Sequence, residues 1–284
     1  MANPLIRDTV FRDYFNDQRR MLSLCNALLS TDYSNPDDVE INTLEGGFFS
    51  NIKNDISCLL HGTAVTIIEH QSTINPNMPF RCFEYSLELY RKIIAPYRNR
   101  FYRTTLVSLP FPYFATIYNG KKPAKPFQTL CLSNAFGGKS HALEVKVDVF
   151  NLAYAEELPI ANCTFLMQYR TFMDRINTNR LIMTPEQAVQ KAARECIADG
   201  IMADYLSQKQ KEVYHMLAYE WNENDARQSW KEEGIEQGIE QGIDVSFAVM
   251  DALRSGFSIE ETAEKQHIAI EHVQHIANAM RSRM

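Results

Sequence analysis

The chain has no apolar run that approaches the roughly 20 residues needed to span a bilayer. Its first segment, Met1 to Asp13, carries charges early and lacks the apolar core of a secretory signal. The six cysteines lie far apart and include no Cys-x-x-Cys pair, which disfavours both a zinc site and a disulfide framework. These absences predict a cytoplasmic protein with reduced cysteines and no membrane association.

Several motifs of well-known enzyme classes are also missing. The sequence has no Gly-rich phosphate loop, no Gly-x-Ser-x-Gly elbow and no Cys–His nucleophile signature. The histidines outside one short run described below show no metal-ligand spacing with an acidic partner. The hydrophobic and charged fractions, 45% and 23%, are ordinary for a globular protein, and 284 residues suit one large domain with an appendage.

Basic residues are concentrated in the middle of the chain. From Pro79 to Lys146 there are eleven Lys and Arg against three Asp and Glu, a local charge of +8, whereas the whole chain carries −6. Such a block is typical either of a phosphate-facing surface or of a solvated face without a ligand, and charge alone does not choose. The residues that could face phosphate are Arg91, Lys92, Arg98, Arg100, Arg103, Lys121, Lys122, Lys125 and Lys139.

A β-branched run that ends in polar residues is the most informative local pattern. Residues 65–68 (Val-Thr-Ile-Ile) indicate a buried strand, and Glu69, His70 and Gln71 follow it directly. Side chains alternate faces along a strand, so Glu69 and Gln71 point to one side and His70 to the other.

A second strand precedes this one and predicts a hairpin. Residues 54–60 form it, and His61-Gly62-Thr63 is a plausible tight turn. With the hairpin centred on Gly62, Asp55 lies seven residues before the centre and Glu69 seven after it. The two carboxylates would then lie opposite each other, close enough to share a divalent cation.

The surrounding periodicity predicts a helix, three strands, a helix and a strand, and hence an α/β fold. The two helices are expected over 9–30 and from Pro79 to Pro96. Strands are expected at 39–44, in the hairpin, and at 113–118 before an Asn-Gly turn. Residues 130–132 and 143–150 are expected to add strands at a sheet edge, and the chain becomes helical from Thr184 onward.

The hairpin and its continuation resemble a known family. Asp55…Glu69-x-Gln71 resembles the PD-(D/E)XK nuclease signature. The longer block Glu-His-Gln-Ser-Thr-Ile-Asn-Pro-Asn-Met-Pro-Phe-Arg, residues 69–81, is similar to the recombination-promoting nuclease (Rpn-like transposase) family of bacteria. Residues 117–120 (Ile-Tyr-Asn-Gly), residues 132–136 (Leu-Ser-Asn-Ala-Phe) and the C-terminal Gly-Ile-Glu-Gln repeats fit the same family.

The resemblance implies a PD-(D/E)XK restriction-endonuclease-like core with a helical C-terminal extension. It implies a Mg²⁺-dependent endodeoxyribonuclease, with Mn²⁺ as a possible substitute, that cuts DNA and promotes recombination or transposition-like events. The implied metal ligands are Asp55, Glu69 and the backbone carbonyl of His70. Gln71 takes the place of the usual lysine and could orient the attacking water, since an amide can hydrogen-bond but cannot carry charge.

Two questions at this site stay open in the sequence. A catalytically weak or inactive nuclease-derived protein that binds DNA or oligomerises is the alternative, because Gln71 lacks the positive charge of lysine. A further acid from the first helix, Asp13 or Asp17, could complete the metal site.

The second helix carries the candidates for nucleic-acid binding. Arg81 and Tyr85 lie four residues apart and could contact phosphate or merely support the helix surface. Arg91 and Lys92 are further nucleic-acid-binding candidates.

The sequence predicts that the chain has three parts. These are a nuclease-like domain over 1–220, a Gly/Glu-rich helical connector over 221–243, and a small helix-turn-helix-like module over 244–284. In the connector, Gly234, Gly238 and Gly242 recur every four residues beside isoleucines. Glycine costs about 1 kcal/mol relative to alanine in a helix, so this stripe indicates either a close-packed second helix or a spacer. Lys231 to Glu264 holds nine acids against two bases, which favours homo-oligomerisation over DNA reading.

Overall fold

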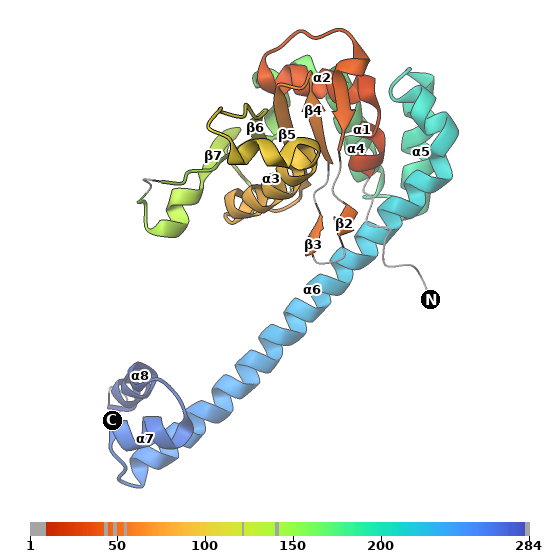
Figure 1. Cartoon of the computed structure of the whole chain (residues 1–284). Helices are drawn as coiled ribbons and strands as arrows, with labels where there is room; N and C mark the ends of the chain where they lie inside the picture. The colour runs from red at the N-terminus through yellow and green to blue at the C-terminus, as the bar shows by residue number, and fades with distance from the viewer. Residues whose placement is uncertain are drawn as a thin grey trace. The chain divides into compact units, whose positions relative to one another are not determined.

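The computed structural model of the chain describes residues 10–42, 45–47, 50–53, 56–120, 122–139 and 142–281. The chain forms two compact units, Met1–Ala218 and Tyr219–Met284 (Figure 1). Unit 1 is an α/β domain built on a mixed six-stranded sheet, which confirms the predicted α/β class. The boundary between the units lies next to residue 220, where the sequence predicts the end of the first domain. Within the described residues, no helix combines the length and apolarity needed to cross a membrane.

The N-terminal helical region consists of two helices, α1 (Val10–Phe15) and α2 (Gln18–Leu29). The prediction of one continuous helix over 9–30 is therefore wrong. The chain is extended at Asp17, whose carboxylate accepts a hydrogen bond from the backbone N–H of Arg20 at 3.1 Å. This N-cap starts a new helix, because it satisfies a backbone donor that a continuous helix would use internally.

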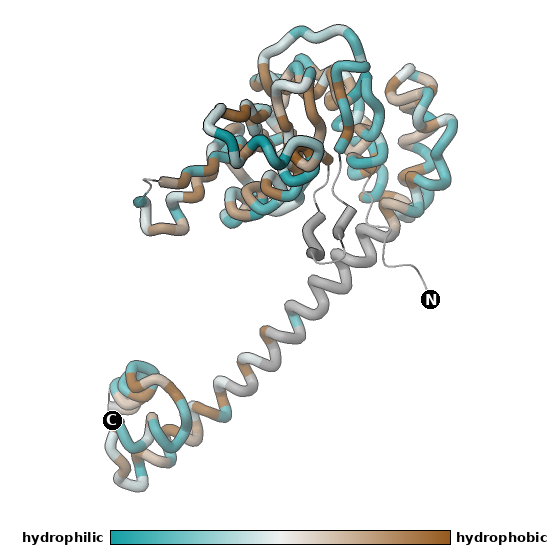
Figure 2. Tube along the Cα trace, viewed as in Figure 1, coloured by the Kyte–Doolittle hydropathy of each residue, from teal (hydrophilic) through white to brown (hydrophobic). Residues whose placement is uncertain are grey.

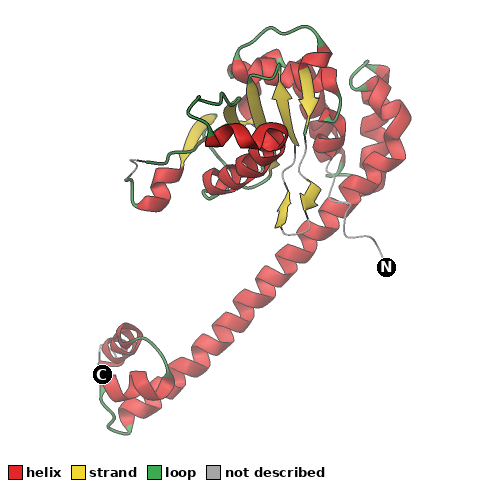
Figure 3. Cartoon of the chain, in the orientation of Figure 1, coloured by secondary structure: helices red, strands yellow, loops and turns green. Residues whose placement is uncertain are grey.

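The sheet has the strand order β1-β4-β5-β6-β8-β7. Figure 3 distinguishes its strands from the helices around them by colour. β1 pairs antiparallel with β4, and β4 with β5, whereas β5, β6 and β8 run parallel and β7 returns antiparallel at the edge. The strands are β1 (Val39–Ile41), β4 (Ile56–Leu60), β5 (Ala64–Gln71), β6 (Phe111–Tyr118), β7 (Phe127–Cys131) and β8 (Lys146–Asn151).

The hairpin between β4 and β5 has the predicted register. Ile56 pairs with Ile68 and Leu60 with Ala64, so the hairpin is centred on Gly62. His61 and Gly62 both have positive φ, 47° and 65°, and the Thr63 N–H donates to the Leu60 carbonyl at 2.9 Å. A glycine accepts this backbone conformation without steric cost, which explains why the turn falls here.

Two features of the antiparallel side differ from prediction. A small separate hairpin, β2 (Glu45–Gly47) with β3 (Ser50–Lys53), lies between β1 and β4 in the chain and was not predicted. β1 ends at Ile41, earlier than the predicted strand over 39–44, of which residues 43 and 44 lie outside the described residues.

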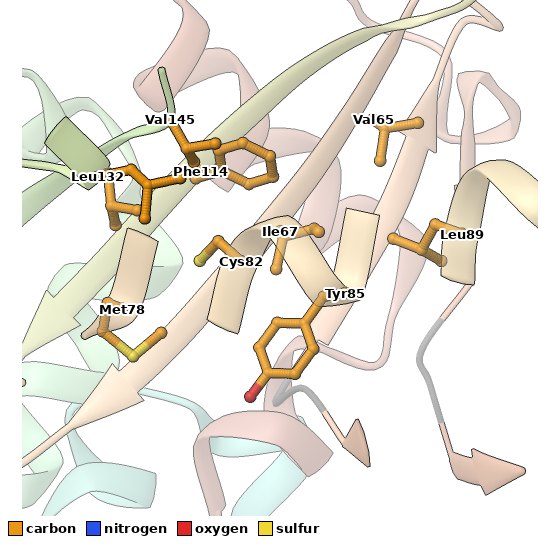
Figure 4. Close-up of a cluster of buried hydrophobic side chains, with 10 residues drawn as sticks. Val65, Ile67, Met78, Cys82, Tyr85, Leu89, Phe114, Leu132 and Val145 are labelled. Atoms are coloured by element: carbon orange, nitrogen blue, oxygen red, sulfur yellow. The ribbon is translucent and has the colours of Figure 1, made fainter. Parts of the chain in front are cut away.

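Helix α3 (Met78–Ile94) covers one face of the sheet (Figure 1). Figure 4 shows its buried side chains, among them Met78, Cys82 and Tyr85, facing Ile67 of β5 and Phe114 of β6. Pro79 lies in its first turn, as predicted, since proline needs no hydrogen-bond partner there. Pro96 ends the α-helix but not the helical path, which continues as the 3-10 helix η2 (Ala95–Tyr102).

The other face of the sheet is covered by α1, α2 and α4 (Thr164–Asn179), with α5 (Pro185–Ala198) packed on α4. α4 was not predicted. The region predicted as edge strands contains β7 at the edge and β8 between β6 and β7. The remaining 3-10 helices are η1 (Pro36–Asp38), η3 (Leu132–Phe136), η4 (Leu152–Glu157) and η5 (Pro159–Asn162).

Unit 2 begins within the helix α6 (Ala203–Arg254) and continues with α7 (Ile259–Gln266) and α8 (Ile270–Arg281). The last turns of α6 pack with α7 and α8 around Val249, Ala263 and Val273. Ser258 and Glu261 form a capping box at the start of α7: the Ser258 N–H donates to the Glu261 Oε2 at 2.8 Å, and the Glu261 N–H donates to the Ser258 Oγ at 3.1 Å. Figure 2 shows hydrophobic and hydrophilic residues alternating along α7 and α8.

Candidate functional site

Glu69 is a nearly buried carboxylate in the middle of the sheet. It lies near the carboxyl end of β5, and only 2% of its surface is exposed. Ile67, two residues earlier on the same strand, belongs to the hydrophobic cluster under α3. Because side chains alternate along a strand, Glu69 points to the α3 face, where the apolar cluster gives way to polar groups.

Arg81 and Tyr85 reach this carboxylate from the first half of α3. The Arg81 Nη2 lies 3.3 Å from the Glu69 Oε2. The same guanidinium donates to the Tyr85 hydroxyl oxygen from Nη2 at 2.6 Å and from Nε at 3.0 Å. Arg81 is partly exposed while Glu69 is buried, so the cation connects a buried charge to the surface. The structure thus places the Arg81 side chain at the Glu69 carboxylate, a contact that was not predicted from the sequence.

The surroundings of Glu69 also affect neighbouring titratable groups. Burial raises the pKa of the Tyr85 hydroxyl, and the Glu69 carboxylate adds to this rise while Arg81 opposes it. The pKa of the Cys82 thiol is raised by burial and by the same carboxylate. Both groups therefore stay protonated at neutral pH, and the charges at this face are those of Glu69 and Arg81.

Gln71 lies on the same face as Glu69, at the last position of β5. Its Nε2 donates to the Met78 Sδ at 2.9 Å. Its Oε1 is buried and has no hydrogen-bond partner among the described residues. An amide oxygen removed from water without a partner costs on the order of 1–3 kcal/mol, so this acceptor is suited to a ligand or an ordered water.

Thr116 is a site residue that the sequence did not indicate. It pairs with Glu69 across β5 and β6, is buried, and its Oγ1 has no hydrogen-bond partner within the described parts of the chain. A threonine in an apolar strand is common for packing reasons, so only the pairing register distinguishes this one. Gln71 Oε1 and Thr116 Oγ1 are thus two buried oxygens on the face that carries Glu69.

His70 points to the opposite face, as strand alternation predicts. Its ring stacks on Phe11 of α1 with centroids 4.7 Å apart, and its Nε2 lies 3.4 Å from the Tyr169 hydroxyl oxygen. Removal from water lowers the pKa of His70 from 6.5 to about 4. The imidazole is therefore neutral at pH 7 and belongs to the packing between the sheet and its helices.

Asp55, the second predicted carboxylate, lies outside the described residues. It directly precedes Ile56, which pairs with Ile68. Among the described residues there is no group of three or more His, Cys, Asp and Glu side chains arranged to hold a metal ion. The described part of the predicted metal site therefore consists of Glu69 and the residues around it.

The other predicted site residues lie elsewhere. Arg91 and Lys92 are in the last turn of α3, and Arg91 forms an ion pair with Glu88. At 1.5 Å per residue, Arg91 lies about 15 Å further along the helix than Arg81. Asp13 accepts from the Lys209 ammonium at 2.7 Å and from the Tyr205 hydroxyl at 2.8 Å, and Asp17 caps α2. None of the contacts described for Arg91, Lys92, Asp13 and Asp17 joins them to Glu69.

Comparisons with protein-family models, with curated proteins and with solved structures found no match to this chain.

Proposed function

We propose that this chain is a Mg²⁺-dependent endodeoxyribonuclease of the PD-(D/E)XK group, similar to the Rpn-like recombination-promoting nucleases. The observation that carries the proposal is the buried Glu69 at the end of a hairpin strand, together with the order of helices and strands along the chain around it. Apart from the separate β2–β3 hairpin, that order is a helix, three antiparallel strands, a helix and a parallel strand: α2, β1, β4, β5, α3 and β6. It is the arrangement that the resemblance implies for a PD-(D/E)XK core.

A buried carboxylate is costly unless a cation compensates it. An ion pair with Arg81 supplies part of that compensation. We infer that Glu69, which is buried at the end of β5 on the face that carries the Gln71 and Thr116 oxygens, binds the divalent cation.

Hard oxygen ligands suit Mg²⁺ and Mn²⁺. Glu69, Asp55 and the backbone carbonyl of His70 would hold the ion, and the unpartnered oxygens of Gln71 and Thr116 fit a site that also holds water. When bound, Mg²⁺ would lower the pKa of a water ligand and stabilise negative charge on the phosphate.

The side chains around Glu69 have separable roles in this proposal. Gln71 Oε1 accepts a hydrogen bond from the attacking water and orients it, but the amide takes no proton. Arg81 provides the positive charge that a lysine at position 71 would provide, and it contacts the phosphate by charge-assisted hydrogen bonds. Tyr85 keeps the guanidinium in place through its hydroxyl oxygen.

A slow or inactive DNA-binding relative of these nucleases is the second candidate. Two observations favour it: Arg81 is paired with Glu69, where it would compete with a metal ion, and Gln71 donates to Met78. In this case DNA binding would persist without cleavage. Catalysis and binding must therefore be measured separately.

Cleavage of supercoiled plasmid DNA in Mg²⁺ tests the proposal. Glu69→Gln and Asp55→Asn should each lower the nicking rate at least about 100-fold, because a removed metal ligand typically costs several kcal/mol of transition-state stabilisation. Gln71→Ala should lower the rate by a smaller factor. Glu88→Gln, which removes a partly exposed carboxylate of α3 that pairs with Arg91 and not with Arg81, is the matched control and should cut like the parent.

If Glu69→Gln retains the parent's rate, the site assignment is wrong. If the parent itself shows no Mg²⁺-dependent cleavage but binds DNA, the second candidate is correct.

A further inference from the structure

The segment after α3 is unusually basic, aromatic and exposed. From Leu89 to Leu143 the sequence contains nine Lys and Arg and no Asp or Glu. Within η2 and the turn after it, Arg98, Arg100 and Arg103 are exposed. Tyr102 is 85% exposed, and Phe101 beside it is 42% exposed. Large exposed aromatic side chains between arginines need an explanation other than packing.

A hollow of about 650 Å³ lies directly beside this segment. Leu59, Leu89 and Ile93 give it apolar walls, whereas Asn42, Lys92 and Tyr97 add polar or aromatic groups. Tyr97 connects the hollow to the arginines, because the Arg100 guanidinium lies 5.7 Å from the centre of the Tyr97 ring.

The hollow is distinct from the Glu69 site. Lys92 lines it and Arg81 contacts Glu69, and eleven residues of α3 separate the two, which corresponds to about 16 Å along the helix. The phosphates of one strand follow each other every 3.4 Å or so along the axis of a duplex and lie further apart in an extended single strand. A strand could therefore contact both places with at most about five nucleotides between them.

We propose that this surface binds an unpaired strand of nucleic acid. A base enters the hollow and stacks on Tyr97, the next bases stack on Phe101 and Tyr102, and Arg98, Arg100 and Arg103 contact the phosphates. Aromatic platforms alternating with a positively charged track are the usual means of binding single strands without sequence preference. A duplex presents no unstacked base face and would use only the arginines.

The rim of the hollow favours a base over an anionic lipid headgroup. Glu40 lies at the rim with Asn42, and its carboxylate would repel a phosphate placed inside. The same groups can hydrogen-bond the edge of a base, since a carboxylate accepts from amino groups and an amide both donates and accepts. The phosphates therefore lie on the arginine side, outside the hollow.

Binding to the full chain is measured by fluorescence anisotropy with a labelled single-stranded DNA of about 12 nucleotides, within the length that single-strand-binding folds cover. The buffer contains EDTA, so the result does not depend on metal or on cleavage. Tyr97→Ala and Tyr102→Ala should each weaken binding about tenfold, the usual loss for one stacked base. Arg100→Ala should also reduce the slope of log affinity against log salt by about 0.7.

Tyr154→Ala and Arg194→Ala are the matched controls, because both residues are exposed and lie away from this segment. Both should bind like the parent, and a duplex of the same length should bind more weakly than the single strand.

Equal binding by the Tyr97→Ala and Tyr102→Ala variants and the parent would overturn the proposal. Equal or tighter binding of the duplex would overturn it as well, as would tighter binding to phosphatidylserine vesicles than to the single strand. If the chain binds the single strand as expected but does not cut DNA, this inference stands and only the proposed nuclease function is wrong.

Discussion

Glu69 and His70 are adjacent in the chain, yet their side chains meet different surroundings. Glu69 faces α3 and an arginine, whereas His70 faces Phe11 and Tyr169 on the other side of the sheet. Strand alternation alone separates a charged site from an apolar contact in this way. The site and the packing behind it can therefore be tested independently by substituting neighbouring residues.

His70 should make the stability of unit 1 depend on pH. Its pKa is about 4 in the folded protein and 6.5 as the ordinary value, so the unfolded chain binds a proton at a higher pH. Stability from this group is therefore complete above about pH 6.5 and falls as the pH drops toward 4, by about 3 kcal/mol in total. Urea unfolding followed by circular dichroism at several pH values measures this loss.

The substitution His70→Phe keeps a ring on Phe11 but cannot be protonated, so it should flatten the loss between pH 6.5 and 4. His61→Gln is the control, since His61 is exposed and contacts Asp38 at the surface. If His70→Phe leaves the pH profile as steep as in the parent, the imidazole is not the group responsible.

At the scale of elements, the hairpin and α3 could be predicted from the sequence, because their signals are local. The Gly62 turn fixes the pairing register, and Pro79 marks the start of the helix. The break at Asp17 depends on a cap whose signal is a single residue within an otherwise helical pattern. The contact between Arg81 and Glu69 brings together residues from two elements, so spacing along the chain could suggest it but not establish it.

Other elements could not be predicted for different reasons. The small β2–β3 hairpin is only three to four residues per strand, too short for a clear alternation. Thr116 joins the site only through its pairing with Glu69, and strand order across a parallel crossover is a tertiary feature.

Ser258 provides a test of local structure in unit 2. Ser258→Ala removes the side-chain acceptor of the capping box, which typically costs about 1 kcal/mol. Amide hydrogen exchange in α7 should accelerate about fivefold, the rate change that corresponds to this energy. Ser255→Ala is the matched control, because the Ser255 hydroxyl donates to the Asp251 carbonyl of the preceding helix α6 and not to α7. Equal exchange in the Ser258→Ala variant and the parent would show that this cap does not limit the opening of α7.

At the scale of the whole molecule, the chain separates an α/β unit from a helical unit. In the second unit Ile235, Ile239, Ile243 and Phe247 recur every four residues and are 50–60% exposed. Residues at this spacing form one ridge on a helix, of the kind that packs against a second helix. A Cβ built on Gly238 or Gly242 meets no described atom within 4 Å, so the room beside the ridge is open. The hypothesis of self-association through this helix rests on these two features.

Replacing Ile239 and Ile243 together by serine should lower the molar mass measured by light scattering, because the double substitution removes apolar area from the ridge. Truncation before Lys231 should have the same effect. Val245→Ser is the control, since Val245 is exposed but lies off the ridge. If the double variant and the truncated chain both keep the oligomeric state of the parent, the hypothesis of self-association is wrong and this part of α6 is a spacer.

The central claim is that Glu69 holds a divalent cation together with Asp55. Anomalous diffraction from crystals of the parent chain soaked in Mn²⁺ tests it most directly. The account predicts a manganese peak within coordination distance, about 2.2 Å, of the Glu69 carboxylate. It also predicts that this peak disappears in Glu69→Gln crystals and persists in Glu88→Gln crystals. A soaked parent crystal in which Arg81 still pairs with Glu69 and no manganese lies at that carboxylate would contradict it.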